Sequence, residues 1–151
     1  MLRAQSGKRS ADAPMRILAI DHGEARCGLA ISDATGTIVR PLQTLPPDAD
    51  AIAAVIAEEG AQAVVVGLPL TLDGEEGAQA KIVRAFSAEL GEAIAIPVEL
   101  FDERLTTAMA SASRRSGAGA DEDSLAAAHL LESYLVAHEN SAPQGHPGDL
   151  A

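Results

Sequence analysis

The chain has 151 residues, of which 47% are hydrophobic and 22% are charged, so it fits one globular domain with a core of ordinary size rather than a disordered chain. Its net charge of −11 argues against non-specific binding to nucleic acid, which depends on Lys and Arg meeting phosphates, so any such function must use a local basic patch or bound cations. A single cysteine, an N-terminal segment without an apolar core and the lack of a run near about 20 apolar residues predict a cytoplasmic protein without a disulfide or a membrane span.

Apolar runs and helical patterns alternate between residues 15 and 138, and we expect the polar segments at 1–14 and 139–151 to be flexible tails. Three closely spaced apolar runs come first and predict an antiparallel meander, at 16–20, 26–32 and 36–42, where Pro41 marks an edge or an end. The later patterns predict a helix at 48–60, a strand at 61–70, a helix at 74–91, a strand at 94–101 and helices at 105–115 and 121–139. This order predicts an α/β domain with a mixed five-stranded sheet, its first three strands antiparallel, and helices on both faces.

Acidic residues stand where two of the predicted strands end. Asp21 closes the first strand, and Glu103 lies just past the fifth. In open α/β folds, sites form at the carboxyl edge of the sheet. If the first, fourth and fifth strands run parallel, both carboxylates reach that edge.

The last predicted helix supplies a third acid. At 3.6 residues per turn, Asp123 lines up with the apolar positions of this helix, whereas Asp121 falls on a more mixed face and Glu122 on another. Asp123 therefore points toward the sheet. An acid in a first helical turn also often serves only as a cap or a partner of the helix dipole, and that alternative stays open at this point.

Three carboxylates at one edge repel one another unless a cation lies among them. Oxygen ligands suit hard ions, so Asp21, Glu103 and Asp123 are candidate ligands for Mg²⁺ or Mn²⁺. Two such ions can activate water and stabilise the leaving oxygen of a phosphodiester. No His or Cys spacing indicates zinc.

Four segments, in this order, resemble the motifs of the YqgF family: “RILAIDHGEARCGLAISD”, “VVVGLPLTLDGEEGAQA”, “ELFDERLTT” and “DEDSLAAAHLLESYL”. The resemblance covers about residues 15–138 and implies a ribonuclease-H-like nuclease domain there. Members of this family are described as nucleases that trim the 5′ end of pre-16S ribosomal RNA and as Holliday-junction resolvases. The resemblance implies metal-dependent phosphodiester cleavage, with Asp21, Glu103 and Asp123 as both the catalytic residues and the metal ligands, and it places Arg104 near a phosphate.

Other residues are candidates for binding substrate, each with a plainer alternative. Gly67 and Pro69 shape a rim loop that contacts substrate or simply turns. The remaining candidates are cations that contact phosphate, form a salt bridge or lie in solvent: Arg26, Lys81, Arg84, Arg114 and Arg115.

Two other classes of protein stay open. One is a ribonuclease-H-like module that binds RNA or protein without cutting, although this chain keeps all three acids. The other is a small phosphate-binding domain of the actin-like kinase type, which needs a second lobe that 151 residues do not provide. The expected partners are structured pre-rRNA or branched DNA, with no membrane, and the chain is expected to be a monomer or a weak homodimer.

Overall fold

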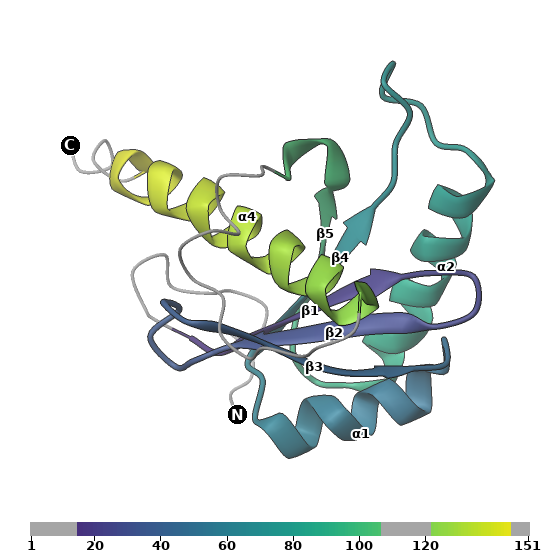
Figure 1. The fold of residues 1–151 in the computed structure, drawn as a ribbon, viewed down its shortest axis with the longest axis horizontal. Coiled ribbons are helices and arrows are strands. Elements are labelled where there is room, and N and C mark those ends of the chain that lie inside the picture. The colour runs from purple at the N-terminus through teal and green to yellow at the C-terminus, as the bar shows by residue number, and fades with distance from the viewer. Residues whose placement is uncertain (1–14, 107–121, 146–151) are drawn as a thin grey trace.

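The computed structural model of the chain describes residues 15–106 and 122–145, with side chains in the second segment as far as His138 (Figure 1). These residues form five strands, three α-helices and one short 3-10 helix: β1 (Ile17–His22), β2 (Cys27–Ser32), β3 (Val39–Leu45), α1 (Ala49–Glu59), β4 (Ala63–Leu68), α2 (Ala78–Ala93), β5 (Val98–Asp102), η2 (Glu103–Leu105) and α4 (Glu122–Gly145). No helix in this part of the chain is long and apolar enough to cross a membrane.

The strands form one sheet in the order β3-β2-β1-β4-β5. β2 pairs antiparallel with both β1 and β3, whereas β4 runs parallel to both β1 and β5. The predicted mixed sheet with an antiparallel beginning is therefore confirmed. β3 is an edge strand, which suits Pro41 because proline has no backbone N–H to donate to a second neighbour.

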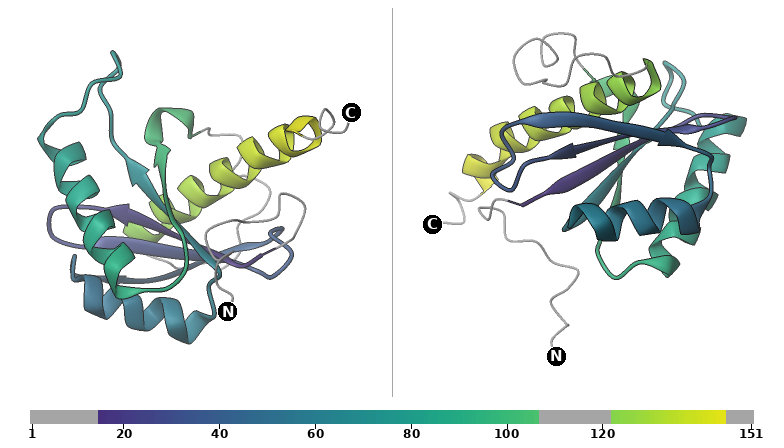
Figure 2. Two further views of the ribbon diagram at one scale, coloured as in Figure 1. Left: turned by 180° about the vertical axis from the view of Figure 1, so that it is seen from behind. Right: turned by 60° about the horizontal axis from the view of Figure 1, so that its bottom comes forward.

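Helices cover both faces of this sheet (Figures 1 and 2): α1 and α2 pack on one face and α4 on the other. Alternation along β1 sends Leu18 and Ile20 into the core beneath α1 and α2, and Ile17 and Ala19 into the core beneath α4. α4 packs mainly on β1, β2 and β3. Its first turn thereby reaches the end of the sheet where β1 finishes.

The first helix begins and ends where its sequence predicts. The side chain of Asp48 accepts hydrogen bonds from the backbone N–H groups of Asp50 and Ala51, which caps the amino end of α1. Gly60 follows the last turn with φ of 72°, a left-handed conformation that glycine adopts without a steric penalty. Local chemistry alone therefore explains the bounds of α1.

Two other elements begin later than predicted. α2 begins at Ala78 rather than at residue 74, because Leu70 forms a bridge with Glu76 and closes the segment between them into a loop. Gly74 turns this loop with φ of 86°. β5 begins at Val98 rather than at residue 94, since Pro97 cannot donate a hydrogen bond to a neighbouring strand.

The C-terminal part of the chain differs in another way. The helical backbone of α4 continues to Gly145, past the predicted end at 139, because residues 139–142 contain neither glycine nor proline. The helix predicted at 105–115 lies outside the described residues except at its start, where η2 and Thr106 stand. Flexible segments at 1–14 and 139–151 stay a prediction.

Candidate active site at the carboxyl edge of the sheet

The parallel strands bring Asp21 and Glu103 together. Asp21 lies near the end of β1, and Glu103 opens η2 directly after β5. Since β4 runs parallel to both β1 and β5, the two side chains reach the same edge, where each carboxyl affects the ionisation of the other.

Burial controls the ionisation of this carboxyl pair. Withdrawal from water, together with the neighbouring carboxyl of Asp21, raises the pKa of Glu103 to about 7. Burial also raises the pKa of Asp21, as does the charge of nearby Asp123. Of the two carboxyl groups, Glu103 has the more strongly raised pKa.

Two glycines make room for the acids. A Cβ on Gly67 would lie 2.6 Å from Glu103 Oε2, so the carboxylate occupies the space that a side chain at this position would fill. A Cβ on Gly28 would lie 1.9 Å from the backbone oxygen of Asp123, so α4 begins directly against the surface of β2. Gly28 also pairs with Asp21 across the β1–β2 ladder. Both glycines therefore determine where the acids lie.

The third acid lies at the beginning of α4, beside the carboxyl pair. The residues that share its helical stripe, among them Ala127, Leu131 and Tyr134, are buried as predicted. The side chain of Asp123 itself is 45% exposed, and its Oδ2 lies 2.9 Å from Nε of Arg26. The hydroxyl of Ser124 donates to the backbone oxygen of Leu42 in β3, which holds this end of the helix. Asp123 is thus placed next to the pair but is engaged by an arginine.

Side-chain contacts also join α4, which carries Asp123, to β5, which leads into Glu103. The hydroxyl of Tyr134 in α4 donates to Oε1 of Glu99 in β5 over 2.7 Å. The rings of Tyr134 and Phe101 meet edge to face at 5.5 Å. These side chains therefore link α4 to β5 at a point remote from Asp21, Glu103 and Asp123.

A divalent cation in a protein is held by several oxygen donors. Among the described residues, no group of three or more His, Cys, Asp or Glu side chains is arranged to hold a metal ion. The half-buried pair of Asp21 and Glu103 nevertheless offers hard oxygen donors whose mutual repulsion a cation would relieve. Asp123 would complete such a set only after leaving Arg26. The chemistry of these donors suits a divalent cation, with two carboxyl groups placed together and the third engaged by Arg26.

Arg104 is bound within the protein rather than directed at the carboxyl pair. Its guanidinium donates to both carboxylate oxygens of Asp102, at 2.7–3.1 Å, and to the backbone oxygen of Leu72 at 3.3 Å. Hydrogen bonds from Arg104 hold the pKa of Asp102 below its usual value. Arg104 therefore ties the 70–76 loop to the end of β5.

The remaining predicted residues occupy varied positions. Gly67 lies inside β4 and not in a rim loop, which corrects the predicted placement: its role is to admit Glu103. Pro69 follows β4 and is half-buried, and Lys81 is exposed on α2. Arg84 Nε lies 2.6 Å from Oε2 of Glu76. Three residues lie outside the described part of the chain: Arg114, Arg115 and Asp121.

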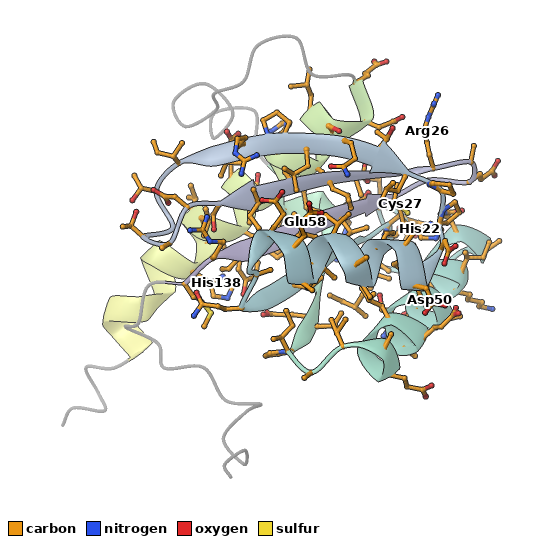
Figure 3. All side chains as sticks on the ribbon, turned by 90° about the horizontal axis from the view of Figure 1, so that it is seen from below. His22, Arg26, Cys27, Asp50, Glu58 and His138 are labelled. Carbon is orange, nitrogen blue, oxygen red and sulfur yellow. The ribbon has the colours of Figure 1, made fainter. Side chains whose placement is uncertain are left out.

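Sequence reasoning missed two contacts at this edge. The first is the ion pair between Asp102 and Arg104, although an acid two residues before an arginine is a signal for such a local pair. Gln79 of α2 approaches Nδ1 of His22 at 3.3 Å, and the His22 ring meets Phe86 edge to face at 4.8 Å. His22 and Cys27 lie on the side of the sheet covered by α1 and α2, whereas Arg26 projects from the end of β2 (Figure 3).

The sheet order, the helices on both faces and the acids at the carboxyl edge define a ribonuclease-H-like protein. Among solved structures, Thermus thermophilus RuvC in complex with a Holliday junction substrate matches with a TM-score of 0.60 at 15% identity, over 84% of this chain and 97% of that chain. Uncomplexed T. thermophilus RuvC matches with the same TM-score at 12% identity, over 83% and 97% of the two chains. At these identities the likeness shows the fold.

The family follows from the sequence comparisons. The RuvX family model, described as Holliday junction resolvase, matches residues 15–137, so the chain belongs to the RuvX family. A curated relative from Chloroflexus aurantiacus, named “Putative pre-16S rRNA nuclease”, is 43% identical over 142 residues, which cover 86% of this chain and 92% of the relative. A relative of the same name from an Anaeromyxobacter species is 46% identical over 132 residues, covering 80% and 96%. The resemblance to YqgF motifs is confirmed.

Proposed function

We propose that this chain is a metal-dependent nuclease that hydrolyses phosphodiester bonds during 5′-end maturation of pre-16S ribosomal RNA, in the cytoplasm. The observation that carries the proposal is the half-buried carboxyl pair of Asp21 and Glu103, with Asp123 beside it, at the edge of a ribonuclease-H-like sheet. The names of the curated relatives support ribosomal RNA as the substrate. A purely structural pair of acids would more readily be replaced by apolar residues, because burying two carboxyl groups is costly.

The three acids have distinct parts in this proposal. Asp21 and Glu103 would hold a divalent ion through their carboxylate oxygens, and Asp123 would add a third ligand on leaving Arg26. A divalent ion such as Mg²⁺ or Mn²⁺, when bound, supplies an activated water and stabilises the leaving oxygen. Gly67 keeps the Glu103 carboxylate in place because no side chain competes for its space.

The charge of this edge explains why a cation is needed. Arg26, Arg84 and Arg104 are each paired with an acid, and the chain carries a net charge of −11. Paired arginines attract a polyanion weakly, so bound cations supply much of the attraction for the phosphates. Further phosphate contacts come from cations along the rim: Arg26, Lys81 and Arg84, with Arg114 and Arg115 beyond the described residues. Pro69 shapes the loop that follows β4.

A second candidate function is resolution of branched DNA. The description of the matching family model favours it, because that description names a Holliday junction resolvase. The fold is compatible with either substrate, since the acids act on the phosphodiester backbone, which RNA and DNA share. The choice between the two depends on the substrate that is cut fastest.

A cleavage assay tests both candidates. The purified chain is incubated with a pre-16S ribosomal RNA fragment and with a four-way DNA junction, each in Mn²⁺, in Mg²⁺ and in excess chelator. We expect cleavage of the RNA in metal and none in chelator. Faster cutting of the junction would favour the resolvase, and undiminished cleavage in chelator would contradict the metal mechanism. No cleavage of either substrate in any metal would favour a binding module.

A further inference from the structure

Arg26 stands at a tight hairpin between β1 and β2, beside the third acid. The backbone oxygen of Arg26 accepts a hydrogen bond of 3.0 Å from the N–H of Gly23, which fixes the main chain at this point. Its side chain is free to move, because 62% of it is exposed and it projects from the end of β2 (Figure 3). Among the described residues, this side chain forms an ion pair with Oδ2 of Asp123, which lies 2.9 Å from its Nε.

The contact between Arg26 and Asp123 differs from the other arginine contact at this edge. Arg104 makes three hydrogen bonds to the side chain of Asp102 and one to a backbone oxygen. Arg26 makes one bond to a half-exposed carboxylate, and water reaches both groups. An ion pair like that of Arg26 and Asp123 contributes little to stability and breaks readily, because water screens its charges and competes for its hydrogen bond.

We propose that Arg26 is an exchangeable counter-ion of Asp123: it neutralises this carboxylate while the site holds no divalent cation, and cation binding releases its guanidinium to a phosphate of the substrate. The inference rests on the proposed function, since a phosphodiester supplies the anion that receives Arg26. The sequence left two roles open for Arg26, a salt bridge and a phosphate contact, and the exchange gives Arg26 each role in turn.

Charge and geometry both support the exchange. Gly28 pairs with Asp21 and lies against the backbone of Asp123, so Asp123 is close enough for a cation held by the half-buried pair to attract it as well. Asp123 cannot bind that cation and keep Arg26 unchanged, because the cation repels the guanidinium. The planar, forked guanidinium suits phosphate oxygens, so its displacement from one anion prepares it for another.

The exchange has a reciprocal consequence. If cation binding frees Arg26 for phosphate, the cation strengthens substrate binding, and the substrate must strengthen cation binding by the same factor. A protein with a net charge of −11 would thereby bind RNA well only when it is loaded with metal. Breaking a half-exposed ion pair lowers cation affinity by only about two- to fivefold, so the site still binds the cation when Arg26 has to be displaced.

Nuclear magnetic resonance observes the exchange directly on the full chain. The Nε–H signals of Arg26 and Arg104 are followed during titration with Mg²⁺, after assignment with Arg26→Lys. We expect Mg²⁺ to shift the Arg26 signal and to accelerate its exchange with water. The Arg104 signal should stay unchanged, because Asp102 retains it. An Arg26 signal that does not change in saturating Mg²⁺ would overturn the proposal.

Calorimetry with Mn²⁺ gives the energetic counterpart. Arg26→Gln should bind Mn²⁺ about two- to fivefold more tightly, because no ion pair has to break. Arg40→Gln is the matched control: Arg40 forms a similar half-exposed pair with Glu59, at the other end of the sheet. Arg104→Gln removes a charge near Glu103 without freeing a proposed ligand. An equal gain in all three variants would indicate general electrostatics and contradict the exchange.

Binding of a labelled RNA duplex, with and without Ca²⁺, tests the second half of the proposal. Arg26→Gln should weaken binding only in Ca²⁺, since without a cation the guanidinium is already engaged by Asp123. Equal weakening in both conditions would contradict release to phosphate. The two proposals fail separately: cleavage with an unchanged Arg26 signal removes only the exchange, whereas a shifted Arg26 signal without cleavage of any nucleic acid removes only the nuclease.

Discussion

Asp102 and Glu103 are neighbours in the chain, yet their environments are opposite. Asp102 accepts three side-chain hydrogen bonds from Arg104, and these bonds lower its pKa. Glu103 faces the half-buried carboxyl of Asp21, and burial together with that charge raises its pKa to about 7. One acid is held by an arginine and has a lowered pKa, while the other has a raised pKa and faces the candidate site.

The difference arises from the backbone and from one glycine. Asp102 ends β5 and accepts a hydrogen bond from the backbone N–H of Arg104, whereas Glu103 begins η2, so the two side chains have different neighbours. Gly67 on the adjacent strand leaves space for the carboxylate of Glu103. A pair of adjacent acids thus divides into one that anchors a loop and one that serves the site, and the predictions below test this division.

Loss of a proposed ligand should have the largest effect. We expect Asp21→Asn, Glu103→Gln and Asp123→Asn each to lower metal-dependent cleavage by more than about 100-fold, since even residues that only support a metal ligand cost 10- to 100-fold. Circular dichroism should show an intact fold. Glu122→Gln, an exposed neighbour of Asp123, is the control and should stay active. An active Asp123→Asn beside an inactive Glu122→Gln would contradict the assignment of α4.

Gly67→Ala should disturb Glu103 while it spares Asp102. The added Cβ would lie 2.6 Å from Glu103 Oε2, so the carboxylate must move, whereas the strand itself can remain. We expect Mn²⁺ affinity, measured by calorimetry, to fall by about tenfold, as for loss of a group that orients a ligand.

Gly91→Ala provides the contrast to Gly67→Ala. Gly91 lies within α2, and a Cβ there meets nothing within 4 Å, so alanine should raise stability by up to about 1 kcal/mol and leave Mn²⁺ affinity unchanged. Unchanged affinity in Gly67→Ala would show that the space beside Gly67 does not position Glu103.

Stability should depend on pH with opposite signs at the two neighbours. The pKa of Glu103 is raised from 4.5 to about 7, so the folded protein binds more protons than the unfolded chain in this range and loses stability as pH rises from 4.5 to 7. Asp102 has a lowered pKa, so its contribution is present above its unfolded value and disappears as pH falls. Melting temperatures of the metal-free protein, measured from below pH 3.8 to above pH 7, report both effects.

Substitution separates the two contributions. Glu103→Gln should flatten the decline in melting temperature between pH 4.5 and 7, with a gain on the order of a few degrees at pH 8. Asp102→Asn should leave that decline in place. Mg²⁺ should raise the melting temperature of the wild type most at high pH, because the ligands must lose their protons. A decline that persists unchanged in Glu103→Gln would show that Glu103 is not its source.

Sequence reasoning recovered the features that depend on periodicity and strand order. The alternation of apolar runs predicted the sheet, and the ends of two strands predicted that Asp21 and Glu103 share an edge. The contact between Arg26 and Asp123 was beyond reach, because it joins residues 97 positions apart through the packing of α4 on Gly28. Glu132 shows the same limit: at 3.6 residues per turn it lines up with Asp121 rather than with the apolar stripe of α4, yet the fold buries it completely.

The smallest expected effect concerns Arg104 and the loop that it anchors. Arg104→Ala removes the link between Asp102 and the backbone oxygen of Leu72, so residues 70–76 should exchange their amide protons faster. The global melting temperature should hardly change, because the pair is exposed and solvent screens it. Hydrogen exchange read by mass spectrometry measures the loop, with Arg40→Ala as the control on a remote strand.

If Arg104 instead contacts phosphate, as the sequence predicted, the substitution should leave loop exchange unchanged and reduce the salt dependence of RNA binding. Because that outcome requires Asp102 to give up a bidentate partner, we expect loop exchange to respond and the salt dependence to stay the same.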